Sequence, residues 1–365
     1  MTQAQVGANE EFATLPLEDE FTAEPETARS MEKATLRLSR EAWNLVFRRT
    51  ARGFVSHQLP DMAATLTYYA VLSLAPSVVA VMSLAALFGQ GRRTANAFLS
   101  SINNVAPGSA ITLLRKPLRQ FIDSPNVGIA LVVAVALAIW ATSSYIGGFG
   151  RGMNRIYQVN EGRPLWRLKP FQILLSVIIL LLGFVTISAI VLTGPVAANV
   201  GDSFDIGATG NIIWTIVKWP ALVVAVILVV TILYYATPNA RHTKLRWMSA
   251  GALLSVIVLI GVSLLFSLYI RDFAHFDRTY RSFAGVIMLL LWLWIANLTL
   301  LFGAEFDAQF ERARQLEAGI AAERHIQLPP RDTEISIKNA KKEASYIEDG
   351  IRIREAADRR RMLGN

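Results

Sequence analysis

Histidines and carboxylates are the side chains of this chain that could do acid–base or metal chemistry, and their spacing favours neither. The four histidines, His57, His242, His275 and His325, lie far apart, and none belongs to a metal-binding pair such as HExxH. The absence of cysteine rules out disulfides, thiolate metal sites and thiol nucleophiles. No Walker-type phosphate loop is present. We therefore predict no catalytic residue, no metal site and no cofactor.

Long apolar segments must position whatever functional groups the chain carries. The sequence is 53% hydrophobic and only 18% charged, whereas a soluble domain carries about 25% charged residues. Because lipid offers no partner to free backbone groups, and because the segments lack the alternation of barrel strands, we predict an all-α bundle of about six transmembrane helices. Each segment has the length of roughly 20 residues that a span needs: about 61–88, 128–150, 171–193, 212–236, 248–270 and 283–304.

The first apolar segment is the most polar of the six. Asp61 follows Pro60 at its start, where a carboxylate can cap free amide groups. Pro76 lies in the middle and should kink the helix, because proline cannot donate a backbone hydrogen bond. Several hydroxyl groups predict that this helix faces the interior of the bundle rather than lipid: Thr65, Thr67, Tyr68, Tyr69, Ser73 and Ser77.

Polar side chains at the edges and in the middle of the spans are candidates for bracing or function. Asp61 could pair with an arginine such as Arg155, or act only as a helix cap. Glu305 could close the bundle in the same way at the end of the last span. Asn297 lies mid-span, where facing lipid would be costly, so it either bonds to a neighbouring helix or lines a cavity. No mid-membrane carboxylate or histidine is visible, which argues against proton coupling.

Basic residues predict the orientation. They gather before the first span and in the second and fourth connections, whereas the connection 194–211 has acids only. Lysine and arginine favour the cytoplasmic side, so both termini are predicted to be cytoplasmic. The first connection, which this scheme places outside, is nevertheless basic. Because the bases flank apolar runs, we expect membrane lipids as partners rather than nucleic acid.

The first connection, about 91–127, is too long for a bare turn. Apolar residues recur at helical spacing on both sides of Pro107-Gly108, which predicts two amphipathic helices on the outer membrane surface or over the bundle. Arg115, Lys116 and Arg119 belong to the second of these helices. They are candidate contacts for anionic lipid head groups, and the alternative is a solvated basic face.

The ends of the chain differ from the middle. Residues 1–30 are acidic and are predicted to be disordered. Residues 31–310 form the predicted membrane domain. Residues 311–365 form a charged cytoplasmic tail, in which 305–325 extends the last helix and the chain beyond Pro329-Pro330 is flexible or loosely helical.

Four runs of sequence, which together span about 40–310, resemble the YihY/BrkB family of bacterial inner-membrane proteins. They are PDMAATLTYYAVLSLAPSVVAVMSL from Pro60, WATSSYIGGFGRGMNRIYQV from Trp140, LYYATPNARHTKLRWMSAGALL from Leu233 and TYRSFAGVIMLLLWLWIANLTLLFGAEFDAQ from Thr279. Arg281 departs from the family, which commonly has glycine there, and this argues against a tight turn at that point. The resemblance implies six spans in the inner membrane with cytoplasmic ends.

The resemblance also implies positions that brace the bundle or carry its function. In this chain they are Asp61, Thr67, Tyr68, Ser73, Pro76, Asn154, Arg155, Tyr280, Gly303 and Glu305. Family members were once labelled as tRNA-processing ribonucleases, and others are linked to serum resistance and to lipopolysaccharide or lipid traffic. The carboxylate–metal or histidine chemistry of RNA cleavage is missing from the sequence.

We therefore expect a non-enzymatic inner-membrane protein, either a transporter or a lipid-handling factor. An envelope scaffold is the first alternative, and it predicts stable partners and no internal cavity. A membrane-tethered ribonuclease is the second, and it predicts metal-dependent RNA cleavage.

Overall fold

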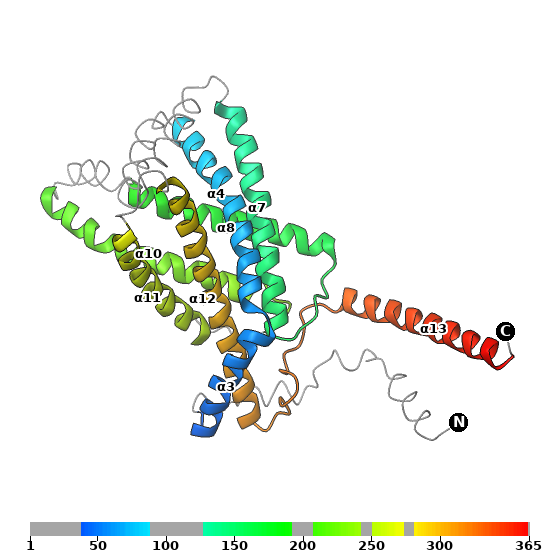
Figure 1. Ribbon diagram of the computed structural model, residues 1–365. Helices are drawn as coiled ribbons and strands as arrows, with labels where there is room; N and C mark the ends of the chain where they lie inside the picture. Colours follow the sequence, from blue (N-terminus) through cyan, green and yellow to red (C-terminus); the bar gives the residue numbers. More distant parts are fainter. Residues whose placement is uncertain (1–37, 88–126, 192–206, 242–249, 274–280, 364–365) are drawn as a thin grey trace.

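The computed structural model describes residues 38–87, 127–191, 207–241, 250–273 and 281–363, and these ranges are built of helices (Figure 1). They contain no named strand and only an isolated bridge between Ala240 and Pro330. The predicted all-α class is confirmed. The helices are α3 (Arg40–Ser56), α4 (Leu59–Leu87), α7 (Val127–Ile156), α8 (Leu165–Val191), α10 (Gly207–Ala236), α11 (Ala250–Phe273), α12 (Arg281–Glu317) and α13 (Glu334–Met362).

Five of these helices are long and apolar enough to cross a membrane: α4, α7, α8, α11 and α12. The sixth predicted span is α10, a helix of 30 residues, in which the described apolar stretch is the shorter Pro220–Ala236. Each predicted segment therefore coincides with a helix. α4 continues without a break through Pro76, and the kink predicted there stays a prediction.

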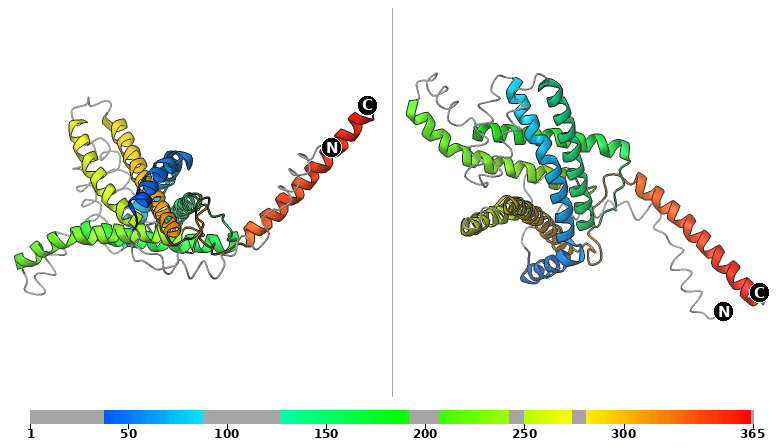
Figure 2. Two further views of the ribbon diagram at one scale, coloured as in Figure 1. Left: turned by 90° about the horizontal axis from the view of Figure 1, so that it is seen from below. Right: turned by 45° about the horizontal axis from the view of Figure 1, so that its top comes forward.

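The spans are arranged around three central helices. α4 and α7 lie side by side along most of their length, and α12 crosses close to them with α11 at its flank (Figures 1 and 2). α8 and α10 are strongly inclined to α4 and α7 (Figures 1 and 2). α3 packs beside the last turns of α12 and runs antiparallel to them, since His57 contacts Glu305 and Ser39 contacts Glu317.

One end of the bundle holds most of the buried core, and we call it the base. Buried residues there include Leu59, Phe149, Ile156 and Leu301, each no more than 1% exposed. The opposite halves of the spans, here called the far halves, carry large exposed apolar side chains. We define the base as α3, the first turns of α4, α8 and α11, the last turns of α7 and α10, the α12 segment 301–317, and the connections 157–164, 237–241 and 318–333.

The carboxyl-terminal region is more regularly helical than predicted. α12 extends to Glu317, which confirms that the last helix continues beyond the span. Residues 318–333 return across the base, and α13 then leads away from it (Figure 1). The segment expected to be flexible or loosely helical is thus a helix of 29 residues. The predicted disordered tail 1–30 and the predicted amphipathic pair, at about 91–127, lie outside the described residues except for Val127.

Candidate functional site

The base contains a buried carboxylate that joins α3 to α12. Glu305 is 0% exposed, and its Oε2 lies 2.7 Å from Nδ1 of His57. Its Oε1 accepts a hydrogen bond of 2.8 Å from Nε2 of Gln309, one turn further along α12. A Cβ on Gly53 of α3 would lie 2.0 Å from that same Oε1, so only glycine leaves room for the carboxylate. Glu305, a predicted brace of the bundle, thus contacts His57 of α3 and Gln309 of α12.

A second buried carboxylate, Asp307, joins α12 to α7 and α11. Its Oδ2 accepts a 2.9 Å hydrogen bond from the hydroxyl of Tyr157, and its Oδ1 accepts a 3.1 Å bond from the backbone N–H of Gly251. The latter amide is in the first turn of α11, where intrahelical acceptors are missing. The carboxylate therefore caps one helix while it holds the end of another.

Small residues let α11 and α12 approach closely above Asp307. A Cβ on Gly251 would lie 2.2 Å from the backbone oxygen of Gly303, and a Cβ on Gly303 would lie 1.7 Å from Oγ of Ser255. The hydroxyl of Tyr234, from α10, lies 2.6 Å from the same Oγ and also donates to the backbone oxygen of Leu300. Gly303, a motif position, is therefore a contact point of three helices, as small residues are in membranes.

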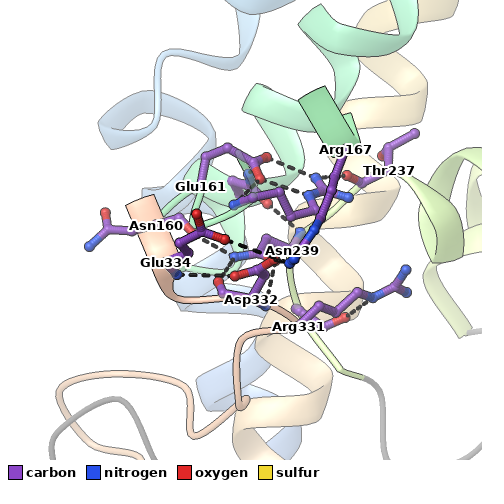
Figure 3. A network of polar contacts seen from close by, with 11 residues as sticks. Asn160, Glu161, Arg167, Thr237, Asn239, Arg331, Asp332 and Glu334 are labelled. Carbon is purple, nitrogen blue, oxygen red and sulfur yellow. Dashed lines mark hydrogen bonds and ion pairs between the residues drawn. The ribbon is translucent and has the colours of Figure 1, made fainter. Parts of the chain in front are cut away.

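A polar network around Asn239 joins the connections of the base (Figure 3). The Asn239 side chain donates to the backbone oxygens of Asn160 at 2.9 Å and Asp332 at 2.8 Å, and accepts from the backbone N–H of Asp332 at 3.2 Å. Its own backbone N–H donates to Oδ1 of Asn154 at 2.8 Å. Asn154 in turn donates to Glu161 at 2.9 Å. The motif residue Asn154 thus holds two connections in register.

Three arginines are joined to this network by hydrogen bonds: Arg163, Arg167 and Arg331. Figure 3 labels the last two. Arg163 binds both carboxylate oxygens of Glu161, at 2.7 and 2.8 Å, and also donates to the backbone oxygen of Thr237 at 2.8 Å. Arg167 donates to Asp332 at 3.0 Å. Arg331 donates to the backbone oxygens of Ala240 and Tyr235 at the end of α10, where the helix dipole favours a cation.

The charges of the network perturb one another. Burial lowers the pKa of Arg331 from its ordinary value, and the positive charges of Arg163 and Arg241 lower it further. The backbone N–H of Glu334 is the main cause that holds the pKa of the Asp332 carboxyl below its ordinary value, and Arg167 lowers that pKa further. Asp332 is therefore stabilised in its ionised form where it contacts Arg167.

A buried guanidinium fixes the return of the chain after α12. Arg312 is 1% exposed, and its Nη1 donates to the backbone oxygens of Ala322, Glu323 and Arg324 at 3.0 to 3.2 Å. Its Nη2 donates to Gln158 at 2.8 Å, after the end of α7. The side chain thus satisfies carbonyl groups that a turn leaves without helical partners.

Polar side chains also meet in the middle of the central helices. The hydroxyl of Tyr145 in α7 donates to Oδ1 of Asn297 in α12 at 2.8 Å. Nδ2 of Asn297 donates to Oγ1 of Thr67 in α4 at 3.3 Å and to the backbone oxygen of Leu293 at 2.9 Å. Asn297 is 4% exposed, so of its two predicted roles the structure matches the bond between helices.

The remaining predicted positions on α4 do not all face inward. Thr67 is buried, but Tyr68 is 61% exposed, and Asp61 and Thr65 are exposed as well. The expectation that the hydroxyl groups of this helix face the bundle interior is therefore wrong for Thr65 and Tyr68. Ser73 and Pro76 are half-buried, and the Ser73 hydroxyl donates to the backbone oxygen of Ala70.

Arg155 reaches the start of α4 but has a different partner there from the one considered. Its Nη2 donates to Oε1 of Gln58 at 3.1 Å, and no ion pair joins Arg155 to Asp61, both of which lie among the described residues. Four further predicted positions lie outside the described residues: Arg115, Lys116, Arg119 and Tyr280.

Sequence reasoning missed most of the polar residues of the base. His57, Asp307, Asn239 and Arg312 were not candidates, although Asp307 and Asn239 stand just after apolar runs, where a polar residue signals a buried partner. Among the residues that the structure describes, no three histidine, aspartate or glutamate side chains are grouped to hold a metal ion. The arrangement of the base binds helices and connections to one another.

The chain is similar to known proteins of one family. The family model described as virulence factor BrkB matches residues 50–326. A ribonuclease-like protein of Bacillus subtilis, YfkH, is 26% identical over 263 residues, which cover 72% of this chain and 94% of that protein. No solved structure matches.

Two further relatives are named UPF0761 membrane proteins. One, from Neisseria meningitidis serogroup C, is 26% identical over 69% of this chain and 58% of its own length. Another, from Xanthomonas campestris, is 27% identical over 76% of this chain and 62% of its own length. The chain thus spans about three fifths of these two relatives. Because the family model covers more than half of its residues, this multi-pass membrane protein belongs to the BrkB virulence factor family.

Proposed function

We propose that this protein is a non-enzymatic lipid-handling factor or transporter of the bacterial inner membrane. The observation that carries the proposal is an exposed polar face on a membrane span. Asp61, Thr65 and Tyr68 follow one another at helical spacing on α4, and all three are exposed. Polar groups that face outward on a span are costly in hydrocarbon, which marks them as functional.

The surroundings of this face suit an amphiphilic ligand. Apolar side chains on the far halves are exposed and can accompany acyl chains, as with Ile129 and Val132 of α7, each 69% exposed. At the base, Arg155 lies beside Gln58 just before Asp61, and its guanidinium can attract an anionic head group. A lipid moving along α4 would meet polar groups for its head and apolar groups for its tails.

The base is proposed to face the cytoplasm. Exposed arginines gather there and favour the cytoplasmic side of a membrane: Arg48, Arg52, Arg151, Arg155 and Arg167. In this orientation the polar face of α4 begins at the cytoplasmic leaflet, where anionic lipids attract basic residues.

A reconstitution experiment tests the proposal. Purified protein in vesicles should accelerate movement of fluorescent phospholipids between leaflets, or flux of a solute from a broad panel. Thr65→Val together with Tyr68→Phe removes two hydroxyl groups at nearly constant volume and should reduce the rate severalfold. The matched control is Thr186→Val on α8, whose hydroxyl, like that of Thr65, donates to the backbone oxygen four residues earlier in its own helix. Absence of any movement with wild-type protein would refute the proposal.

A ribonuclease activity is the alternative suggested by the name of the Bacillus subtilis relative. The same purified protein should then cleave RNA in the presence of divalent metal ions, and a single substitution should abolish the cleavage. An envelope scaffold, the other alternative, is favoured by the long exposed helix α13. It predicts partners that co-purify with wild type and are lost when residues 334–365 are deleted.

A further inference from the structure

The last helix stands apart from the rest of the molecule. α13 leads away from the bundle and is steeply inclined to α4 and α7 (Figures 1 and 2). Ser336 is the buried residue among its 29 residues. The family match ends at residue 326, so α13 lies beyond it. Beyond its first turn most residues of α13 are exposed. A charged helix of this kind is marginal in water by itself, and a partner would stabilise it.

An apolar stripe along α13 shows what kind of partner fits. Its members alternate at spacings of three and four residues, as positions a and d of a coiled coil do: Ile337, Ala340, Ala344, Ile347 and Ile351. We call these five residues the α13 seam. Every member is at least partly exposed, and Ile351 is 39% exposed. The opposite side carries Tyr346 and Ile353, which stand apart among charged residues.

We propose that the α13 seam pairs with the α13 seam of a second copy of this chain, in antiparallel orientation. Copies inserted the same way into one membrane are related by a twofold axis along the membrane normal. Because α13 is directed sideways from the spans (Figure 2), that axis sets two α13 helices antiparallel. Confinement in the membrane raises their effective concentration, so a short seam suffices.

The charges beside the seam select this orientation and its register. In the antiparallel pair with Ala344 opposite Ile347 of the second copy, Ala340 lies opposite Ile351, so each small residue faces a large one. Lys341 then lies near Glu348 of the second copy, and the symmetry repeats this attraction. A parallel pair would instead bring Glu343 near Glu348, which is a repulsion between like charges.

A membrane surface fits α13 less well than a second copy does. Helices that lie on anionic membranes have a broad apolar face and a basic polar face. The α13 seam is narrow and contains two alanines, and acids alternate with bases around the rest of the helix, among them Glu348, Asp349 and Glu355. The basic cluster Arg359, Arg360 and Arg361 lies in the last turn, where it complements the helix dipole.

Cross-linking of single cysteines gives a direct test, because the natural chain has none. Copies of the full chain that carry Ala340→Cys and Ile351→Cys, with different tags, are expressed together and oxidised in membranes. A disulfide between the two variants is expected, with little cross-linking of Ala340→Cys to itself. Equal or stronger cross-linking of Ala340→Cys to itself, or no cross-linking in any combination, would overturn the proposal.

A charged substitution in the seam supplies an independent readout. Ile347→Asp should lower the dimer fraction of the full chain in nanodiscs at least tenfold, measured by mass photometry. Ile353→Asp places the same charge on the opposite side, at a side chain that is 70% exposed, and should leave the dimer intact. An equal fall of the dimer fraction in both variants, or a monomeric wild-type protein, would contradict the pairing. If wild-type protein in nanodiscs instead bound to vesicles of anionic lipid, and Ile347→Asp abolished that binding, the partner of α13 would be a membrane surface.

Discussion

At the base, Glu305, Asn239 and Gln315 are 0% exposed, whereas on the far halves Leu264 and Ile287 are 63% and 62% exposed. The base buries polar groups and joins helices through hydrogen bonds, while the far halves present apolar side chains outward. In a bilayer, apolar side chains gain little by leaving lipid, so close packing and hydrogen bonds must hold helices together. The difference indicates that the base is the rigid part and that the far halves are the part whose packing can change.

The largest expected effect comes from adding a side-chain atom where α11 and α12 approach each other closely at the base. A Cβ on Gly251 would lie 2.2 Å from a backbone oxygen and 2.4 Å from Cβ of Asp307, whereas nothing lies within 4 Å of a Cβ on Gly261, halfway along the same helix. Gly251→Ala should therefore cost about 3 kcal/mol of stability through overpacking. Gly261→Ala should leave the melting temperature in detergent unchanged or raise it slightly. Equal melting temperatures for the two variants would contradict the comparison.

A smaller effect is expected from removing the centre of the polar network. Asn239→Ala leaves the backbone groups of Asn160 and Asp332 without their partner, at a cost of about 2 kcal/mol. Residues 318–333 should become sensitive to limited proteolysis, and the melting temperature should fall. Asn339→Ala, at an exposed position of α13, is the control and should behave as wild type. Unchanged protease resistance of the Asn239 variant would count against the network.

The boundary between the two regions can be tested at the centre of the spans. Tyr145→Phe removes the hydroxyl that donates to Asn297 and should destabilise the protein by about 1 kcal/mol, because hydrogen bonds between membrane helices are modest. Tyr346→Phe, on exposed α13, is the control. If Tyr145→Phe lowered the stability of the protein as much as Gly251→Ala does, the rigid part would extend into the middle of the bundle.

The smallest effect concerns pH. The pKa of Asp332 is lowered in the folded protein, so its contribution to stability is present above the ordinary aspartate pKa of about 3.9 and is lost as the pH falls through the lowered pKa. Wild type should lose stability below about pH 4, and Asp332→Asn should lose less over the same range. Parallel melting curves for both proteins between neutral pH and pH 3 would show that Asp332 does not contribute.

Hydropathy predicted the spans because lipid permits only helices or closed barrels, so a run of apolar residues largely determines its own structure. Glu305 and Asn297 were also found as candidates, since polar residues near apolar runs call for partners, and Asn154 was found through the family resemblance. The partners themselves could not be predicted. Contacts such as that of His57 with Glu305 join positions 248 residues apart, and no local pattern encodes them.

Two errors have physical causes. Hydroxyl content does not tell on which side of α4 each group lies, and Thr67 and Tyr68, although adjacent, point in different directions. The regular helix α13 was expected only as loosely helical, because attention to its charges left the apolar stripe from Ile337 to Ile351 out of account. A search for helical periodicity within charged segments would have found it.

The account depends most on the base lying at the cytoplasmic side of the membrane, with the far halves directed toward the opposite side. In this cysteine-free chain, Gly128→Cys at the far end of α7 and Ala321→Cys in the base give two labelling sites, both exposed. A membrane-impermeant maleimide applied to spheroplasts should label the cysteine at position 128, and should label the cysteine at position 321 only after the membrane is opened. Labelling at position 321 in closed spheroplasts would contradict the account.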